Sequence, residues 1–149
     1  SEISAAFGLE QLSKLNDRLK KRKKNFSFIK NYLMKNHSDY FYLPEQQENT
    51  ESGWLAFPIV LKSQKKNLRN MLQMFLEKRN IQTRAIFSGN VTKQPFMKNH
   101  KYRVNKKIFK NADLIMNNGL LLGCHQLLGV KEIKFVCNSI TQFIKKNFK

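Results

Sequence analysis

The chain has 149 residues, a length that suits one ordinary domain with its own hydrophobic core. Hydrophobic residues make up 41% of it, with only 6 Gly and 3 Pro, which excludes a disordered or collagen-like chain. The formal net charge of +18 comes mostly from 22 Lys against 6 Arg. Because the lysines are spread along the chain and arginine, the usual reader of bases and phosphates, is scarce, this charge does not by itself favour nucleic-acid binding.

The cellular setting follows from what the sequence lacks. No apolar run approaches the ~18 residues that cross a bilayer, and the first residues lack the basic-then-apolar pattern of a signal peptide. The two cysteines, Cys124 and Cys137, are not spaced as a metal or iron–sulfur site would require. We therefore expect a cytoplasmic protein with no membrane partner and no metal.

The first predicted element is one long helix. Apolar side chains recur at steps of three or four from Ser4 to about Met34, which predicts a helix roughly 45 Å long. Such a helix exceeds the diameter of the domain, so we expect it to pack against another domain or a partner subunit. The basic run Lys20–Lys24 is then a solvated stretch of this helix, and the acidic segment Pro44–Gly53 is a loop.

Shorter elements follow. Residues 54–61 predict a strand, which Pro58 confines to a sheet edge or a bulge, and Asn67 caps a helix that ends near Asn80. Beyond that helix we expect a strand over 81–87, a turn at 88–90, an irregular polar segment through Tyr102 and Val104, a weak helix over 106–116, a strand over 119–124 and a helix over 130–148. This order predicts an α/β domain, a small sheet covered by helices.

Known catalytic motifs are absent from the sequence: there is no HExxH, Walker loop, GxGxxG or GxSxG. Of the three histidines, His37 and His100 lie in polar surroundings and are expected to be exposed to solvent. His125 differs because it directly follows a strand, a common position for ligand contact.

The segment around Arg84 is the other candidate for binding. Arg84 lies in a predicted strand and requires an anionic partner, which a phosphate, a diphosphate or a surface carboxylate would provide. Phe87 offers a face for stacking on a sugar or base, and Asn90 tolerates a left-handed turn while offering both a donor and an acceptor. A surface salt bridge followed by an ordinary hairpin explains the same residues.

Several segments, spread over nearly the whole chain, resemble one family. The first carries SEISAAFGLEQL, which is similar to the E-x-x-A-A-x-G-L-x-Q-L helix of the vitamin-B6-dependent sugar aminotransferases (DegT/DnrJ/EryC/StrS). The other segments resemble the NDP-4-keto-6-deoxyhexose 3-dehydratases of that family: GWLAFP at 53–58, NIQTR at 80–84, FSGN at 87–90, Gln94-Pro95, YRV at 102–104 and ADLIMNN at 112–118. Residues 119–128 depart from this branch, and His125 is instead similar to the Leu-Pro-x-His of aminotransferase members.

The resemblance implies the C-terminal small domain of a type I pyridoxal phosphate (PLP) aminotransferase fold, with a mostly antiparallel sheet. Family chains are more than twice as long, so residues 1–149 are expected to be a single-domain fragment. Its parent would use PLP or pyridoxamine phosphate (PMP), and the lysine, or the histidine that replaces it in dehydratases, would precede Ser1. No catalytic or cofactor-binding residue is then expected in this chain, and the fragment alone should lack turnover.

The implied activity is C3 dehydration of a CDP-4-keto-6-deoxyglucose-type sugar in lipopolysaccharide biosynthesis, with aminotransfer as the alternative. The expected partners are a nucleotide-linked keto sugar and a second subunit of a homodimer. The resemblance does not decide whether the parent enzyme uses an iron–sulfur cluster or a reductase partner. The expected substrate-binding residues are Arg84, Phe87, Asn90, Tyr102, Arg103 and His125. A stand-alone basic module that binds nucleic acid or another polyanion is the alternative from a different functional class.

Overall fold

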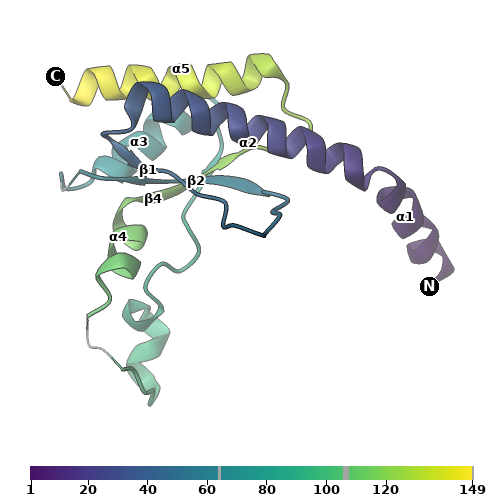
Figure 1. Ribbon diagram of the computed structural model, residues 1–149. Coiled ribbons are helices and arrows are strands. Elements are labelled where there is room, and N and C mark those ends of the chain that lie inside the picture. Colours follow the sequence, from purple (N-terminus) through teal and green to yellow (C-terminus); the bar gives the residue numbers. More distant parts are fainter. Residues whose placement is uncertain (64, 106–107, 149) are drawn as a thin grey trace.

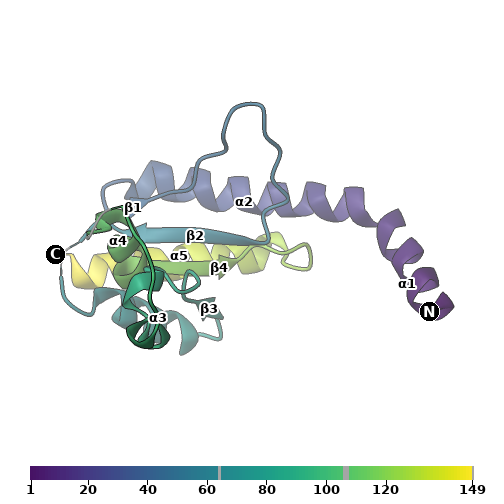
Figure 2. The ribbon, with the colours of Figure 1, turned by 90° about the horizontal axis from the view of Figure 1, so that it is seen from below.

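The computed structural model describes residues 1–63, 65–105 and 108–148. Within these residues, four short strands form one antiparallel sheet (Figures 1 and 2). The strand order is β1 (Phe41–Tyr42), β2 (Ala56–Leu61), β4 (Gly119–Gly123) and β3 (Thr83–Arg84). The predicted small sheet covered by helices and its expected antiparallel pairing are confirmed, and the domain is of the α+β class.

Three helices cover one face of the sheet: α2 (Leu15–His37), α3 (Leu68–Glu77) and α5 (Val130–Asn147). Alternation along β2 explains why, because Phe57, Ile59 and Leu61 are buried while the residues between them are half-buried. The helices add apolar stripes to the same core: Phe26, Ile29 and Leu33 from α2, Leu68, Leu72 and Leu76 from α3, and Ile133, Val136, Cys137, Ile140, Phe143 and Ile144 from α5. Burial of these stripes against the strands is the main stabilising contribution to the fold.

The opposite face of the sheet is covered less completely. Helix α4 (Lys110–Asn118) and two 3₁₀ turns, η1 (Val91–Lys93) and η2 (Pro95–Asn99), lie on this side (Figure 1). Asn118 at the end of α4 donates to the carbonyl oxygens of Leu61 (2.9 Å) and Ser63 (3.0 Å), which ties this helix to the end of β2. The side chains of Ala56, Pro58 and Val60 remain half-buried.

The prediction of a single long helix from Ser4 to about Met34 is wrong. The structure has two helices, α1 (Glu2–Ser13) and α2, which are separated at Lys14, where the backbone angles are φ −93° and ψ −3°. These angles lie in the bridge region rather than in the helical minimum, and α1 turns away from the body of the domain there (Figures 1 and 2). Helix α1 buries none of its residues, whereas α2 has the buried stripe that the spacing predicted.

Left-handed backbone explains why some elements are shorter than expected. Asn80 (φ 58°) and Phe87 (φ 45°) bound the segment predicted as a strand, and only Thr83 and Arg84 inside it pair with β4. Trp54 (φ 33°) likewise delays the start of β2 to Ala56. Extended backbone cannot pass through a positive φ, so each strand stops short of these residues.

Other local predictions also need correction. Asn67 precedes α3 but is itself left-handed (φ 63°) and its side chain makes no capping bond. The strand β1 was not expected, and turns η1 and η2 occupy part of the segment predicted to be irregular. Helix α4 begins at Lys110, and residues 106 and 107 of the predicted 106–116 helix lie outside the described residues.

Pro58 lies in an inner strand rather than in an edge strand, but β1 pairs only with Val60 and Leu61. At Pro58, strand β2 pairs with Leu121 of β4 and has no partner in β1. The missing N–H of Pro58 therefore removes no hydrogen bond to β1.

His37, expected to be exposed, is only 7% exposed at the end of α2. None of the helices in the described ranges is both long enough and apolar enough to cross a membrane.

Candidate functional site

A groove of about 1000 Å³ opens beside β3 and the first turns of α5. Side chains line it from four places: residues 55–56 at the start of β2, residues 80–87 around β3, residues 121–128 at the end of β4, and residues 131–136 on α5. Much of this lining is apolar, including Leu55, Phe87, Leu128 and Phe135. A concave, largely apolar site with a few charged groups is the usual form of a ligand pocket.

Arg84 brings a positive charge to this groove. In the sheet it lies opposite Leu121, while its neighbour Thr83 is buried and donates to the Glu77 carboxylate of α3 (2.7 Å). Successive residues of a strand point to opposite faces, so Arg84 points away from Thr83 and Glu77, and it lines the groove. No Asp or Glu in the described ranges forms an ion pair with it. The surface salt bridge considered from the sequence is therefore not seen in these residues, and the guanidinium is available to an anion.

Phe87 lines the groove with its ring 90% exposed. Its backbone is left-handed (φ 45°), and its N–H donates to the carbonyl of Ala85 (3.0 Å) in a tight turn. A bulky residue in this backbone region is uncommon and is often a sign of function. An exposed aromatic face at the rim of a groove suits the stacking of a planar or sugar ring.

His125 follows β4, as expected, and also lines the groove. Its Nδ1 accepts a hydrogen bond from the N–H of Leu127 (3.3 Å), which assigns the proton of the neutral ring to Nε2. The loop is anchored to α2, since the Asn25 side chain donates to the carbonyls of His125 (3.0 Å) and Leu128 (3.1 Å). Arg22 of the basic run donates to Gln126 (2.8 Å), so one member of that run holds this loop in place.

Helix α5 adds three polar or aromatic side chains that the sequence reasoning missed: Lys131, Glu132 and Phe135. Lys131 supplies a second positive charge, whereas the Glu132 carboxylate accepts the N–H of Gly129 (2.9 Å) and caps the helix. One signal was available, because Phe135 is a large apolar residue outside the buried stripe of α5 and is 50% exposed. The groove thus combines cations on two sides with an apolar wall.

The remaining predicted site residues lie outside the lining of this groove. Asn90 is only 4% exposed, and its amide is bonded to Asp113 and Thr92. Tyr102 is 49% exposed, and Arg103 is also exposed, in the segment between η2 and α4. The structure therefore brings together Arg84, Phe87 and His125, and sets Asn90, Tyr102 and Arg103 apart from them.

The two thiols are unsuited to nucleophilic chemistry. Burial raises the pKa of Cys124 to about 11 and that of Cys137 to about 12. Neutral thiols are poor nucleophiles and poor metal ligands. Within the described part of the chain, no group of three or more His, Cys, Asp or Glu side chains is arranged to hold a metal ion.

Comparison with known proteins identifies the family. The model of the DegT/DnrJ/EryC1/StrS aminotransferase family matches residues 1–141. The chain belongs to the DegT/DnrJ/EryC1/StrS family. This match confirms the family to which its motifs pointed, and the chain corresponds to the C-terminal part of these PLP enzymes.

Curated relatives of this DegT/DnrJ/EryC1/StrS chain include dehydratases and transaminases. It is 34% identical over 148 residues to the lipopolysaccharide biosynthesis protein RfbH of Salmonella typhimurium, covering 99% of this chain and 33% of that protein. It is also 34% identical over 136 residues to a GDP-4-keto-6-deoxy-D-mannose 3-dehydratase of Escherichia coli (91% and 34%). A UDP-4-amino-4,6-dideoxy-N-acetyl-beta-L-altrosamine transaminase of Campylobacter jejuni is 24% identical over 151 residues (98% and 37%). The chain thus spans about a third of the length of these relatives.

Solved structures agree with the fold of this DegT/DnrJ/EryC1/StrS chain. A GDP-4-keto-6-deoxymannose-3-dehydratase with a trapped PLP-glutamate geminal diamine has a TM-score of 0.78 and 32% identity, covering 93% of this chain and 35% of that chain. A mutant of that dehydratase with bound GDP-perosamine has the same TM-score, 31% identity and the same coverage. These relatives bind PLP and a nucleotide sugar.

The groove of this DegT/DnrJ/EryC1/StrS chain does not by itself fit a pyridoxal cofactor. Its only lysine among the described lining residues is Lys131, which is exposed, and its only acid is Glu132, whose carboxylate caps α5. A Schiff-base lysine with a carboxylate facing the pyridine nitrogen is not formed there. We therefore assign no cofactor chemistry to these residues.

Proposed function

We propose that this chain is the substrate-side small domain of a nucleotide-sugar 3-dehydratase of the CDP-4-keto-6-deoxyglucose type, acting in cell-surface polysaccharide synthesis. The observation that carries the proposal is the groove, which Arg84, Lys131 and Phe87 line together with apolar side chains. A nucleotide sugar combines a diphosphate with planar and ring-shaped groups. Two cations and an aromatic rim match these two parts.

Each groove residue then has a positioning role. The Arg84 guanidinium binds the diphosphate, with Lys131 as a second cation, and Phe87 stacks on the base or sugar. His125, with its proton on Nε2, donates a hydrogen bond to a sugar hydroxyl or carbonyl. Binding energy from these contacts orients the reacting carbon, while the PLP or PMP and the residues that handle it belong to the part of the enzyme outside this chain. The fragment alone is accordingly inactive.

Dehydration is favoured over aminotransfer by the relatives, because RfbH and the 3-dehydratase are each 34% identical to this chain and the transaminase 24%. Aminotransfer is the second candidate, supported by that transaminase over 98% of the chain and by His125, which resembles the aminotransferase pattern. In the complete enzyme, a histidine at the cofactor-lysine position would indicate dehydration, and a lysine would indicate aminotransfer.

A binding experiment with matched lysine variants tests the proposal. CDP-glucose and GDP-mannose are titrated into the wild-type chain and into the variants Lys131→Ala and Lys134→Ala by calorimetry. Both lysines are exposed on α5, but only Lys131 lines the groove. We expect Lys131→Ala to raise Kd by roughly 3- to 10-fold, as the loss of a charge-assisted contact predicts, and Lys134→Ala to leave it unchanged.

Equal effects of the two variants would contradict a groove-specific site. Tight binding of any polyanion, with a steep loss of affinity on adding salt, would instead support the basic binding module.

A further inference from the structure

The loop that carries Phe87 is held by contacts within the loop and with α4. Two turns shape it, in which the N–H of Phe87 donates to Ala85 (3.0 Å) and the N–H of Gly89 donates to Ile86 (3.1 Å). Gly89 is left-handed (φ 59°), and a Cβ placed there would lie 2.3 Å from Cβ of Met116. The loop therefore passes against α4 at a distance that only glycine permits.

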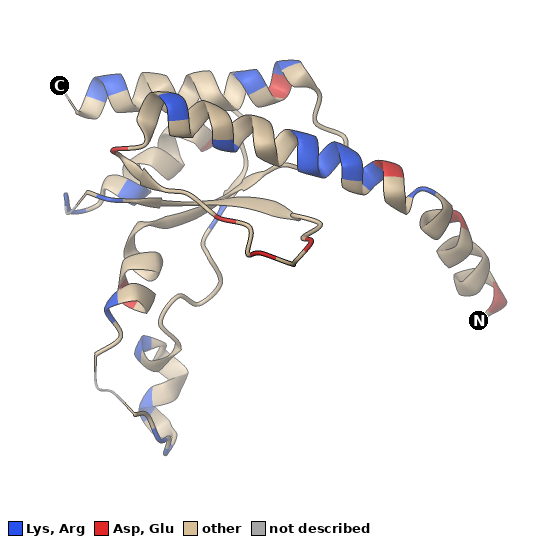
Figure 3. Cartoon of the chain, in the orientation of Figure 1, with Lys and Arg blue, Asp and Glu red and all other residues tan. Residues whose placement is uncertain are grey.

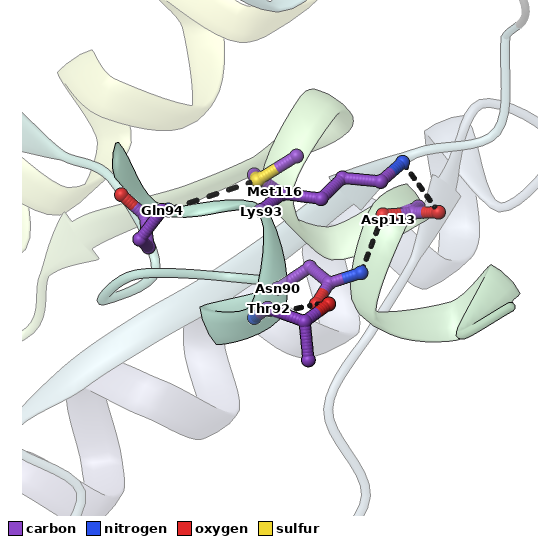
Figure 4. A network of polar contacts seen from close by, with 6 residues as sticks. All are labelled: Asn90, Thr92, Lys93, Gln94, Asp113 and Met116. Carbon is purple, nitrogen blue, oxygen red and sulfur yellow. Dashed lines mark hydrogen bonds and ion pairs between the residues drawn. The ribbon is translucent and has the colours of Figure 1, made fainter. Parts of the chain in front are cut away.

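Asn90 bonds the end of this loop to α4 (Figure 4). Its Nδ2 donates to Oδ1 of Asp113 (2.8 Å), and its Oδ1 accepts both the N–H (3.1 Å) and the hydroxyl (2.6 Å) of Thr92. The second oxygen of Asp113 pairs with Lys93 (2.9 Å). Both ends of the Asn90 amide are thus occupied, and the side chain is 4% exposed.

A further bond closes the same loop. The Gln94 amide donates to the carbonyl of Ser88 (2.7 Å), across the turn that contains Gly89, and contacts the Met116 sulfur (3.9 Å) (Figure 4). Residues 88–94 are therefore bonded to one another and to α4. A loop fixed in this way holds the backbone of Phe87, from which the exposed ring projects, in one place without a ligand.

We propose that Asn90 and Asp113 are positioning residues that hold Phe87 at the rim of the groove for a nucleotide sugar, and that Asn90 does not touch the ligand. This inference rests on the proposed function of the groove. A buried amide that accepts two hydrogen bonds and donates one to a carboxylate has a structural role. Phe87, left-handed and 90% exposed, keeps its conformation because the residues after it are fixed.

A reciprocal exchange of side chains tests this role. Asn90→Asp places a carboxylate against Asp113, whereas Asn90→Asp combined with Asp113→Asn restores one amide and one carboxylate with unchanged net charge. Hydrogen exchange at the amides of Gly89 and Thr92 reports on the loop, and the Kd of CDP-glucose reports on binding. We expect Asn90→Asp to speed exchange and raise Kd by about tenfold each, the factor for one lost hydrogen bond, and the double variant to restore both.

A double-mutant cycle shows whether the effect passes through Phe87. In a Phe87→Ala background, Asn90→Asp should leave Kd unchanged, because the ring that it positions is gone. If Asn90→Asp does not fold, as judged by circular dichroism, Thr92→Val is used in the same cycle in place of Asn90→Asp. Thr92→Val removes the hydroxyl that donates to the Asn90 oxygen. Additive effects on Kd, or faster exchange with an unchanged Kd, would overturn the positioning role.

The outcomes also separate this inference from the proposed function. If Arg84→Gln raises the wild-type Kd but Phe87→Ala does not, the groove is still the binding site. The positioning role of the Asn90–Asp113 contact is then overturned. If the wild-type chain binds neither CDP-glucose nor GDP-mannose, the proposed function fails and the positioning role fails with it.

Discussion

At the scale of single residues, the same sequence signals served binding and folding. The positions of Arg84 in a strand and of His125 directly after a strand predict that both bind substrate, and both line the groove. The turn geometry of Asn90, with its donor and acceptor, predicts the same role, but its amide instead bonds a loop to α4. A turn-forming Asn that faces a ligand and one that faces its own backbone look alike in sequence, since both need the same groups.

His37 shows a consequence of burial that the sequence did not reveal. Its Nε2 bonds to the Thr141 hydroxyl (2.7 Å), and that hydroxyl donates to the carbonyl of Cys137 (3.2 Å), so Nε2 is the donor. Nδ1 is then unprotonated and buried with no hydrogen-bond partner in the described residues. The pKa of His37 is lowered mainly because burial desolvates the ring, and to a smaller extent by the nearby positive charge of Lys145.

This lowered pKa predicts that the domain is less stable in mild acid. The unfolded chain binds a proton near pH 6.5, whereas folded His37 resists protonation, so its contribution is complete above about pH 6.5 and declines as pH falls toward the lower folded pKa. Urea unfolding at pH 7.5 and pH 5.0 measures the difference. We expect His37→Gln to reduce the loss of stability at pH 5.0.

An unchanged pH dependence in His37→Gln would contradict this account. The carboxyl groups whose pKa is lowered in the fold, Asp113 and Glu77, titrate below their ordinary values of 3.8 and 4.5 and so contribute little between pH 7.5 and pH 5.0.

At the scale of elements, periodicity predicted the parts that pack together. The buried stripes of α3 and α5 and the strand β4 follow from spacing because most of their apolar residues face one core. The break at Lys14 and the left-handed residues Trp54 and Phe87 were not predictable, since neither lysine nor an aromatic residue signals such backbone. The groove residues on α5 were missed because they lie on its outer face.

Helix α1 is predicted to be less stable than α2. It buries no residue, and its apolar side chains, among them Phe7 (67%) and Leu9 (70%), are exposed. Its amides should exchange with solvent faster than those of α2 around Ile29, which is fully buried. In denaturant unfolding, we expect Leu9→Ala to change stability by less than about 0.5 kcal/mol and Ile29→Ala to cost roughly 2–5 kcal/mol. Comparable losses would show that α1 is part of the cooperative core.

At the scale of the whole molecule, the large positive charge is arranged less simply than its total suggests. Figure 3 shows the basic run of α2 in blue and red segments in the loop after β1. An ion pair between Lys23 and Glu51 joins the two, and Arg22 of the same run bonds to Gln126 in the loop of His125. Part of this charge therefore stabilises the fold, while Arg84, which has no ion pair in the described ranges, remains free for a ligand.

The most direct test of the proposed nucleotide-sugar site is the affinity of the chain for CDP-glucose before and after Arg84→Gln. The guanidinium lines the groove and has no ion pair among the described residues, so its removal should raise Kd by roughly 10- to 100-fold, as the loss of a charge-assisted hydrogen bond predicts. Arg103→Gln, outside the groove, is the matched control and should leave Kd unchanged. The same Kd for the wild type and Arg84→Gln would contradict the assignment of this groove to a nucleotide sugar.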